Sequence, residues 1–228
     1  MLRPFEVLVV CTANVCRSPL AEHIIATRIA YAVAHQTIPE RVIDVTSAGD
    51  HAEVGQPMCP QSAALLGEPA HEHHSRPITT ALLENSDLVL GADRGNRGEC
   101  ARLLPACRPH LFTLRQAAEL AQTVVTELAN HKLPDSAPPL PDHPSDRLRW
   151  LVTEMDAARG SRAGEPEGSD DITDNHGNID HLPTLKQVEA ASTALADAFI
   201  AVLNAPIDVD GDESPYGEGH AEHEPLKY

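Results

Sequence analysis

Residues 7–19 read VLVVCTANVCRSP, and they give the strongest indication of the fold. The unbroken aliphatic run at 7–10 indicates a strand buried on both faces, as at the centre of a parallel sheet. Cys11 ends the strand, and Arg17 follows after five intervening residues. Pro19 suits the first turn of a helix that begins there. The order of strand, short loop and helix predicts the start of an α/β unit.

The same alternation continues along the chain. It predicts an α/β fold with a parallel sheet and right-handed crossovers. After a first helix with an apolar stripe that includes Ile25 and Ile29, the pattern predicts strands at 42–46, 87–90 and 111–113. Residues 47–49, Ser-Ala-Gly, are expected to stop the second strand. Further helices are expected at 58–67, 78–85, 94–103, 115–129, 145–158 and 184–203.

We expect one domain over residues 1–204. A Pro-rich insertion at about 131–146 and a Gly/Ser/Glu-rich segment at 160–170 interrupt it, and the second of these is expected to be mobile. Residues 205–228 are acidic and rich in Gly, Pro and His, which is typical of a disordered tail.

Composition limits the class of partner. With 17 Lys and Arg against 34 Asp and Glu, the 228 residues carry a formal charge of -17. This charge disfavours nucleic acid and anionic membranes as partners, although local backbone amides can still bind an anion. No apolar run reaches the roughly 18 residues of a membrane span, and the first residues show no cleavage pattern, so we expect a cytoplasmic protein. Five scattered cysteines fit reduced thiols better than a disulfide framework.

The loop after the first strand is a candidate anion site. Backbone amides in a curled loop and at a helix N-terminus point at a bound oxyanion, and Arg17 can grip two of its oxygens. The same field stabilises a thiolate at Cys11, which makes it a candidate nucleophile, and Ser18 is placed to donate to that sulfur. A buried structural cysteine is the alternative. A zinc site is not expected, because Cys11 and Cys16 have no matching second pair of ligands in the sequence. The Gly and Lys pattern of a nucleotide P-loop is absent.

At this point the sequence resembles the low-molecular-weight protein-tyrosine-phosphatase family. The family pattern Cys-x4-Cys-Arg-Ser-Pro follows the first strand, and residues 11–19 show it whole. The resemblance covers about 5–130 and 145–204. It includes the segments SAG (47–49), HHSRPIT (73–79), DLVL (87–90), FTLR (112–115) and DDITD (170–174). It implies a doubly wound, four-stranded parallel sheet with flanking helices.

The resemblance also implies roles for individual residues. Cys11 would be the nucleophile that takes the phosphoryl group. Arg17 and the loop residues Thr12, Ala13, Asn14, Val15, Cys16 and Ser18 would bind phosphate. Ser18 would also stabilise the sulfur as a leaving group. Asn14 would hold the curl of the loop, with Ser47 and His73 as partners, and Cys16 would trap oxidised Cys11 as a disulfide.

A general acid is needed to protonate the leaving oxygen. In the family it is an aspartate on the loop before the last helix, usually followed by proline. Asp174 matches that position, with Asn175 in place of the proline and His176-Gly177 where aromatic residues are frequent. Asp171 and Asp142 are the alternatives.

We therefore expect a hydrolase that removes phosphate from phosphotyrosine in proteins, through a phosphocysteine at Cys11 and without metal or other cofactor. Apolar Val15 would face the substrate ring and favours an aromatic phosphoester. The alternatives are an arsenate reductase or related thiol oxidoreductase on the same fold, and a phosphoprotein-binding module that is a weak catalyst. Cys59, Cys100 and Cys107 are expected to be packing residues.

Overall fold

The computed structural model describes residues 3–35, 38, 41–66, 70, 72–162, 168–175 and 180–206. Four strands are formed by β1 (Phe5–Cys11), β2 (Ile43–Gly49), β3 (Leu88–Gly91) and β4 (Leu111–Thr113). The helices are α1 (Arg17–Ala34), α2 (Pro60–Leu66), α3 (Thr80–Asn85), α4 (Arg94–Leu103), α5 (Leu114–Ala129), α6 (Pro144–Ala157) and α7 (Leu182–Leu203). Two 3-10 helices, η2 (Pro105–His110) and η3 (Ala158–Arg162), were not predicted.

The strands form one parallel sheet in the order β2-β1-β3-β4, which confirms the predicted fold class. β1 lies between β2 and β3, so the strand that carries Cys11 is central. Its apolar run is explained by burial on both sides: Val7 and Val9 belong to one hydrophobic cluster, and Leu8 and Val10 to the other. The period of two in a strand sends neighbouring side chains to opposite faces.

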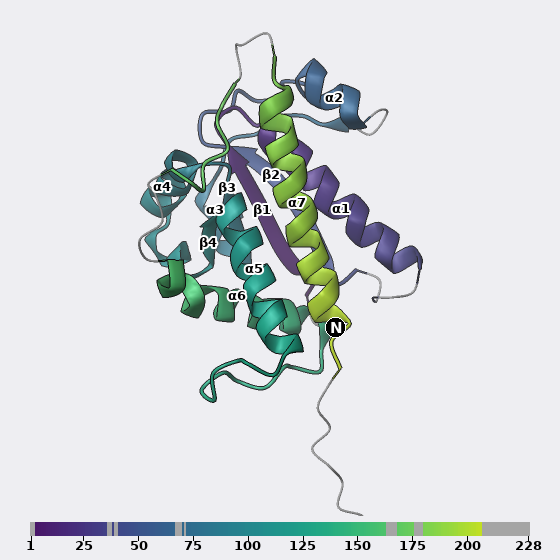
Figure 1. The fold of residues 1–228 in the computed structure, drawn as a ribbon. Coiled ribbons are helices and arrows are strands. Elements are labelled where there is room, and N and C mark those ends of the chain that lie inside the picture. Colours follow the sequence, from purple (N-terminus) through teal and green to yellow (C-terminus); the bar gives the residue numbers. More distant parts are fainter. Residues whose placement is uncertain are drawn as a thin grey trace, which may run out of the picture.

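Helices cover both faces of the sheet. One cluster joins the sheet to α1, α5, α6 and α7, and its buried residues include Ile25, Leu120 and Phe199. Helix α7 lies beside α1 and α5 across that face (Figure 1). The smaller cluster lies on the other face and includes Leu83 of α3 together with Cys100 and Cys107. Both of these cysteines are fully buried, which confirms that they are packing residues.

The predicted end of the second strand was wrong. Residues 47–49 do not stop β2 but continue it, and Gly49 pairs with Cys11 in register. A side chain at Gly49 would collide with the loop, because its Cβ would lie 2.6 Å from Thr12 O and 2.9 Å from Asn14 N. This glycine allows close approach of two backbones rather than a turn. The predicted start of the last helix was also late by two residues, since α7 begins at Leu182.

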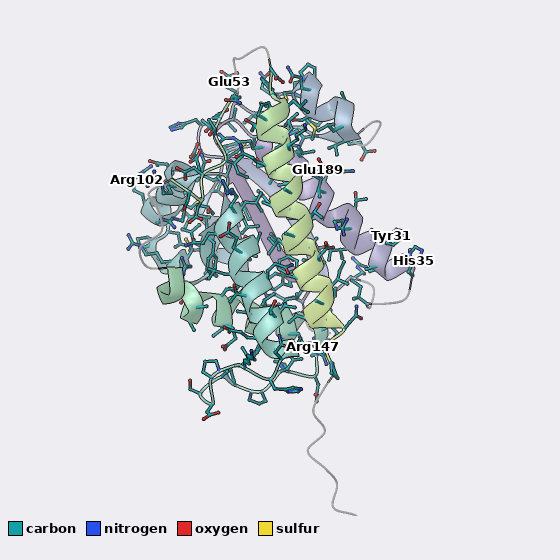
Figure 2. All side chains as sticks on the ribbon, viewed as in Figure 1. Tyr31, His35, Glu53, Arg102, Arg147 and Glu189 are labelled. Carbon is teal, nitrogen blue, oxygen red and sulfur yellow. The ribbon has the colours of Figure 1, made fainter. Side chains whose placement is uncertain are left out.

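The Pro-rich segment lies at the end of the sheet opposite to the start of α7 (Figure 1). It is fixed there by Arg147, which is buried at the C-terminal end of α7 (Figure 2). The Arg147 guanidinium donates to Pro141 O at 2.8 Å and to the carbonyls of Leu203 and Ala205 at 3.0 and 2.8 Å. Arg147 of α6 therefore caps the C-terminal end of α7 and ties Pro141 of the insertion to it. The tail from 207 onwards and the middle of the segment predicted to be mobile, 163–167, lie outside the described residues.

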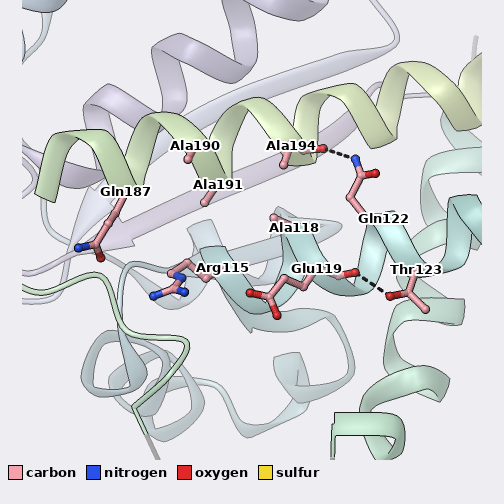
Figure 3. A pocket seen from close by; sticks show the side chains of 9 residues that line it. All are labelled: Arg115, Ala118, Glu119, Gln122, Thr123, Gln187, Ala190, Ala191 and Ala194. Carbon is pink, nitrogen blue, oxygen red and sulfur yellow. Dashed lines mark hydrogen bonds between the residues drawn. The ribbon is translucent and has the colours of Figure 1, made fainter. Parts of the chain in front are cut away.

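A cavity of about 760 Å³ lies between α5 and α7. Figure 3 shows its floor of small side chains, Ala118, Ala190, Ala191 and Ala194, with Arg115, Glu119 and Gln187 beside them. It contains none of the candidate catalytic or phosphate-binding residues. In the described residues, no helix is long and apolar enough to cross a membrane.

Candidate active site

The candidate site lies where the sheet order reverses. From β1 the chain crosses to β2 on one side, and from β2 it crosses to β3 on the other. The loops that leave β1 and β3 therefore diverge at their C-terminal ends and open the crevice in which parallel α/β sheets bind ligands. Cys11 ends β1, and Asp93 follows β3 after one intervening residue.

The loop between β1 and α1 is curled around Asn14. This residue has a φ of 55°, in the left-handed region, and is fully buried. Its amide donates to Ser18 Oγ at 2.9 Å and to Ser47 Oγ at 2.8 Å. Its side-chain oxygen accepts from the backbone N–H of Arg76 at 3.0 Å, and its backbone oxygen lies 2.7 Å from His73 Nε2. Four contacts thus hold one strained residue, and they join the loop to β2 and to the segment before α3.

Cys11 lies at the base of this loop. Its Sγ is 3.0 Å from Ser18 Oγ, on the first turn of α1. The Ser18 hydroxyl also lies 3.3 Å from Ala48 O and accepts from Asn14. A hydroxyl fixed in this way can donate to a sulfur anion, and the N-terminus of α1 adds a partial positive charge. The arrangement suits a thiolate nucleophile.

The guanidinium of Arg17 is buried and has a partner on each side. Its Nη1 donates to Asp93 at 2.7 Å and to Ile172 O at 2.9 Å. Its Nη2 donates to Asp174 at 2.6 Å and to Thr12 Oγ1 at 3.1 Å. Burial by itself lowers the pKa of Arg17, but the charges of Cys11, Asp174 and Asp93 outweigh it and raise the pKa above its ordinary value. The group is therefore a permanent cation at the mouth of the loop.

Asp174 follows two residues that are tied to the fold. Ile172 N donates to Ala92 O at 3.0 Å, and Thr173 O accepts from Thr184 Oγ1 at 2.9 Å. The carboxyl itself is 39% exposed and reaches Arg17. A carboxyl that is accessible and within reach of the anion site can exchange protons with a substrate.

The two alternative acids are placed differently. Asp171 accepts from Arg94 N at 2.8 Å and from Arg94 Nε at 3.0 Å, so it anchors the segment to the start of α4. Asp142 is exposed and precedes α6, on the Pro-rich segment at the far end of the sheet. His176 and Gly177 lie outside the described residues.

A cavity of about 420 Å³ opens beside the loop. Ala13 and Val15 form its loop side, and its remaining lining residues are His51, Glu53, Gln56, Pro57, Met58, Cys59 and Pro60. The wall nearest to Val15 is apolar, which suits a flat hydrophobic group, while Glu53 supplies a carboxylate. The cavity is the space into which the body of a substrate would extend.

Behind the loop lies a group of side chains that the sequence did not indicate. Cys16, Cys59 and His181 are buried together around Ser62. The Ser62 Oγ lies 3.2 Å from Cys16 Sγ and 3.1 Å from Cys59 Sγ. The hydrogen bond between the thiols raises the pKa of Cys16, to which burial adds, and it lowers the pKa of Cys59. Cys59 is buried within the hydrophobic cluster, in line with the expectation of a packing residue, and its thiol also contacts Ser62.

Sequence reasoning missed Asp93, Asn96 and Arg76. Asp93 caps α4 by accepting from Asn96 N at 2.9 Å, while its second oxygen holds Arg17. Asn96 Nδ2 also donates to Asp50 at 2.8 Å. A signal for Asp93 was present, since an N-cap aspartate directly after a strand next to β1 must lie at the same edge of the sheet. Arg76 supports the loop by donating its backbone N–H to Asn14 Oδ1. Every residue except proline carries such a group, so the sequence gives no signal for it.

Comparison with known proteins adds to this geometry. Residues 6–130 match the family described as low molecular weight phosphotyrosine protein phosphatase. The chain belongs to this family. The match contains the Cys11 loop, β2 and β3, and it ends before the segment that carries Asp174. It favours a cysteine-based phosphatase over an arsenate reductase or a binding module.

Similar proteins are named either for phosphotyrosine or for phosphoarginine as the substrate. The chain is 32% identical over 111 residues, 47% of its length, to a probable low molecular weight protein-tyrosine-phosphatase EpsP of Ralstonia nicotianae, of which 69% is covered. It is also 32% identical over 116 residues to a protein-arginine-phosphatase of Bacillus subtilis, which covers 49% of this chain and 71% of the relative. The crystal structure of YfkJ from Bacillus subtilis shares the fold, with a TM-score of 0.55 at 17% identity over 86% of this chain and 94% of that one.

Proposed function

We propose that the protein hydrolyses phosphotyrosine in protein substrates through a phosphocysteine at Cys11. One observation carries the proposal: Cys11, Arg17 and Asp174 converge on one loop, with Arg17 joined to Asp174 at 2.6 Å and Ser18 Oγ 3.0 Å from Cys11 Sγ. A nucleophile, an oxyanion clamp and an acid are thereby present within one crevice.

In the first step, the Cys11 thiolate attacks phosphorus and the bond to the tyrosyl oxygen breaks. The phosphoryl oxygens are held by Arg17 and by the backbone amides of residues 12–18, which are oriented by the curl at Asn14. Asp174 gives its proton to the leaving oxygen, so that a neutral phenol departs.

In the second step, water attacks the phosphocysteine. Asp174, now ionised, accepts a proton from that water, and the phosphorus–sulfur bond breaks to release inorganic phosphate. Ser18 donates to the leaving sulfur and Cys11 returns to its thiolate form. The step consumes one water molecule, and the side chains that act in it are those of Cys11, Ser18 and Asp174.

The phosphate bound in this way competes with Asp174 for Arg17. When the oxyanion occupies the guanidinium, the carboxyl is displaced by like charge toward the outer face of the loop. That face is where the leaving oxygen of a substrate in the cavity beside Val15 would lie. The ion pair is thus a resting position for the acid.

Phosphotyrosine is preferred in this proposal because Val15, Pro57, Met58 and Pro60 offer an apolar wall to an aromatic ring. The relative named protein-arginine-phosphatase makes phosphoarginine the informative competitor. Two peptides that differ only in phosphotyrosine or phosphoarginine should be compared by kcat/KM. A preference for phosphoarginine would contradict the assignment of substrate while leaving the cysteine mechanism intact.

The mechanism is tested by hydrolysis of p-nitrophenyl phosphate in reducing buffer that contains a metal chelator. Wild type is expected to turn over and Cys11→Ser to lose turnover. Cys107→Ser is the matched control, because Cys107 is equally buried but lies in the cluster on the opposite face of the sheet. Turnover that survives in Cys11→Ser, or is absent from folded, reduced wild type, would overturn the proposal.

A further inference from the structure

Cys16, Cys59 and His181 come from three distant parts of the chain and meet behind the phosphate-binding loop. Each stands immediately before a helix, since α1 begins at Arg17, α2 at Pro60 and α7 at Leu182. Their relative exposures are 6%, 6% and 7%, so the cluster is largely buried, with Cys59 also lining the cavity beside Val15. The loop mechanism uses neither Cys59 nor His181.

The donor atoms have the spacing of a metal site. His181 Nδ1 lies 3.8 Å from Cys16 Sγ and 3.7 Å from Cys59 Sγ, and all three atoms lie within 4.8 Å of one another. Tetrahedral zinc with bonds of about 2.3 Å to sulfur and about 2.0 Å to nitrogen separates such donors by roughly 3.5–3.8 Å. Only small side-chain rotations are needed to bring the three atoms to one ion.

The chemistry of the donors selects the kind of metal. Two sulfurs and an imidazole form a soft to borderline set that prefers Zn²⁺ to the oxygen-seeking Mg²⁺ and Ca²⁺. Two thiolates and a neutral imidazole also balance the charge of a divalent ion, which keeps a buried site neutral. The Ser62 hydroxyl lies 3.1 Å from Cys59 Sγ and 3.2 Å from Cys16 Sγ. This hydroxyl, or a water molecule beside it, would be the fourth ligand of a tetrahedral ion.

We propose that Cys16, Cys59 and His181 form a binding site for one Zn²⁺ ion. The site shares Cys16 with the phosphate-binding loop but lies behind it and does not include Cys11, and the inference does not rest on the proposed function. Occupation would link the loop at Cys16 to the start of α7 at His181, seven residues after Asp174. Two hydrogen bonds already connect these segments without a metal. Cys59 N donates to Val15 O in the loop at 2.6 Å, and His181 N donates to Gln61 Oε1 of α2 at 2.8 Å.

The test uses reduced, metal-free full-length protein, with Zn²⁺ titrated against a chromogenic chelator and bound metal counted by elemental analysis. We expect one tight equivalent for wild type. Cys59→Ser and His181→Gln should weaken Zn²⁺ binding at least about 100-fold. Loss of a direct metal ligand should cost more than loss of a residue that only hydrogen-bonds to a ligand. Cys107→Ser and Cys11→Ser should bind like wild type. Absence of a tight equivalent in wild type, or equal affinity in Cys59→Ser, would overturn the proposal.

A second measurement does not depend on the variants being folded. Co²⁺ added to wild type should give the visible absorption of a tetrahedral ion and the near-ultraviolet charge transfer of thiolate ligation. Addition of Zn²⁺ should abolish both signals. A spectrum without thiolate charge transfer would place the metal on histidines or carboxylates elsewhere and would contradict the assignment.

Discussion

The Nη2 atom of Arg17 lies 2.6 Å from Oδ2 of Asp174, so the arginine proposed to bind phosphate also holds the proposed acid. The two residues are 157 positions apart in the chain. They meet because the N-terminus of α1 and the segment before α7 both lie at the C-terminal edge of the sheet. In the proposed mechanism, an anion bound at Arg17 would release the carboxyl of Asp174.

Asp174→Asn should lower kcat for p-nitrophenyl phosphate by about 100-fold or more, because the proton donor is lost. The same change should tighten inhibition by inorganic phosphate, since Arg17 no longer has a competing carboxylate. Steady-state kinetics with phosphate as a competitive inhibitor measures both. Asp142→Asn is the control and should change neither value. Weaker phosphate inhibition in Asp174→Asn would contradict the resting-position interpretation.

Arg17→Lys should lower kcat/KM by about 100–1,000-fold, as expected for loss of a clamp on transition-state charge. Lysine keeps the charge but cannot reach Asp93, Ile172 O and an oxyanion at the same time. Arg28→Lys is a matched control, because Arg28 forms an exposed ion pair with Asp197. Comparable losses in the two variants would show that the effect is general destabilisation.

Asn14 offers a test of the curled loop. Asn14→Ala loses the side-chain hydrogen bonds and keeps the strain of a φ of 55°, whereas Asn14→Gly loses the bonds and relieves the strain. We expect both to lower turnover at least about tenfold, with Asn14→Gly the more stable by about 1 kcal/mol in denaturant unfolding. Turnover equal to wild type in Asn14→Gly would mean that the hydrogen bonds do not orient the loop.

The partly buried carboxyl of Asp50 is expected to make the free energy of unfolding depend on pH. Burial raises its pKa above the ordinary 3.8, with smaller contributions from Asp93 and Glu99, against the lowering effects of Asn96 and His51. Because the native state favours the protonated form, this group contributes stability at pH below 3.8, and the contribution is lost as pH rises through the native pKa. In addition, Asp50 Oδ1 and Asn96 Oδ1 are both buried without a hydrogen-bond partner among the described residues.

Asp50→Asn should therefore stabilise the protein at pH 7 by about 1 kcal/mol, because an amide at this position is uncharged and offers donors beside Asn96. The gain should shrink as the pH falls toward 3.8, because protonation of Asp50 removes the buried charge from wild type. Urea unfolding at both pH values measures the difference, with exposed Asp135→Asn as the control. A gain that is independent of pH would exclude charge burial as its cause.

Arg147→Met should destabilise the fold by about 3 kcal/mol, because buried carbonyls at the end of α7 lose a charged donor. The KM for p-nitrophenyl phosphate should stay within about twofold of wild type, since Arg147 lies at the end of the sheet away from Cys11. Thermal unfolding and kinetics on the same preparation measure the two effects. Arg102→Met, at an exposed position on α4 (Figure 2), should change stability by less than about 0.5 kcal/mol.

Features that depend on neighbouring residues could be predicted from the amino-acid sequence. The run at 7–10 specifies a strand buried on both faces, and the spacing of Cys11, Arg17 and Ser18 specifies a loop that leads into a helix. These features are local because a few residues fix both the backbone path and the groups that line it. Resemblance extended this reading to Ser47, His73 and Asp174, whose side chains the fold brings to the loop or to Arg17.

Contacts between residues far apart in the chain became visible only in the folded protein. Pairing of Cys11 with Gly49 extended β2 through residues 47–49, where local sequence indicated a stop. Asp93 became a partner of Arg17 because β3 lies next to β1, and Cys16, Cys59 and His181 met because three helices begin behind one loop. Such contacts depend on sheet order and on the register of parallel strands, which long-range packing sets and no local spacing encodes.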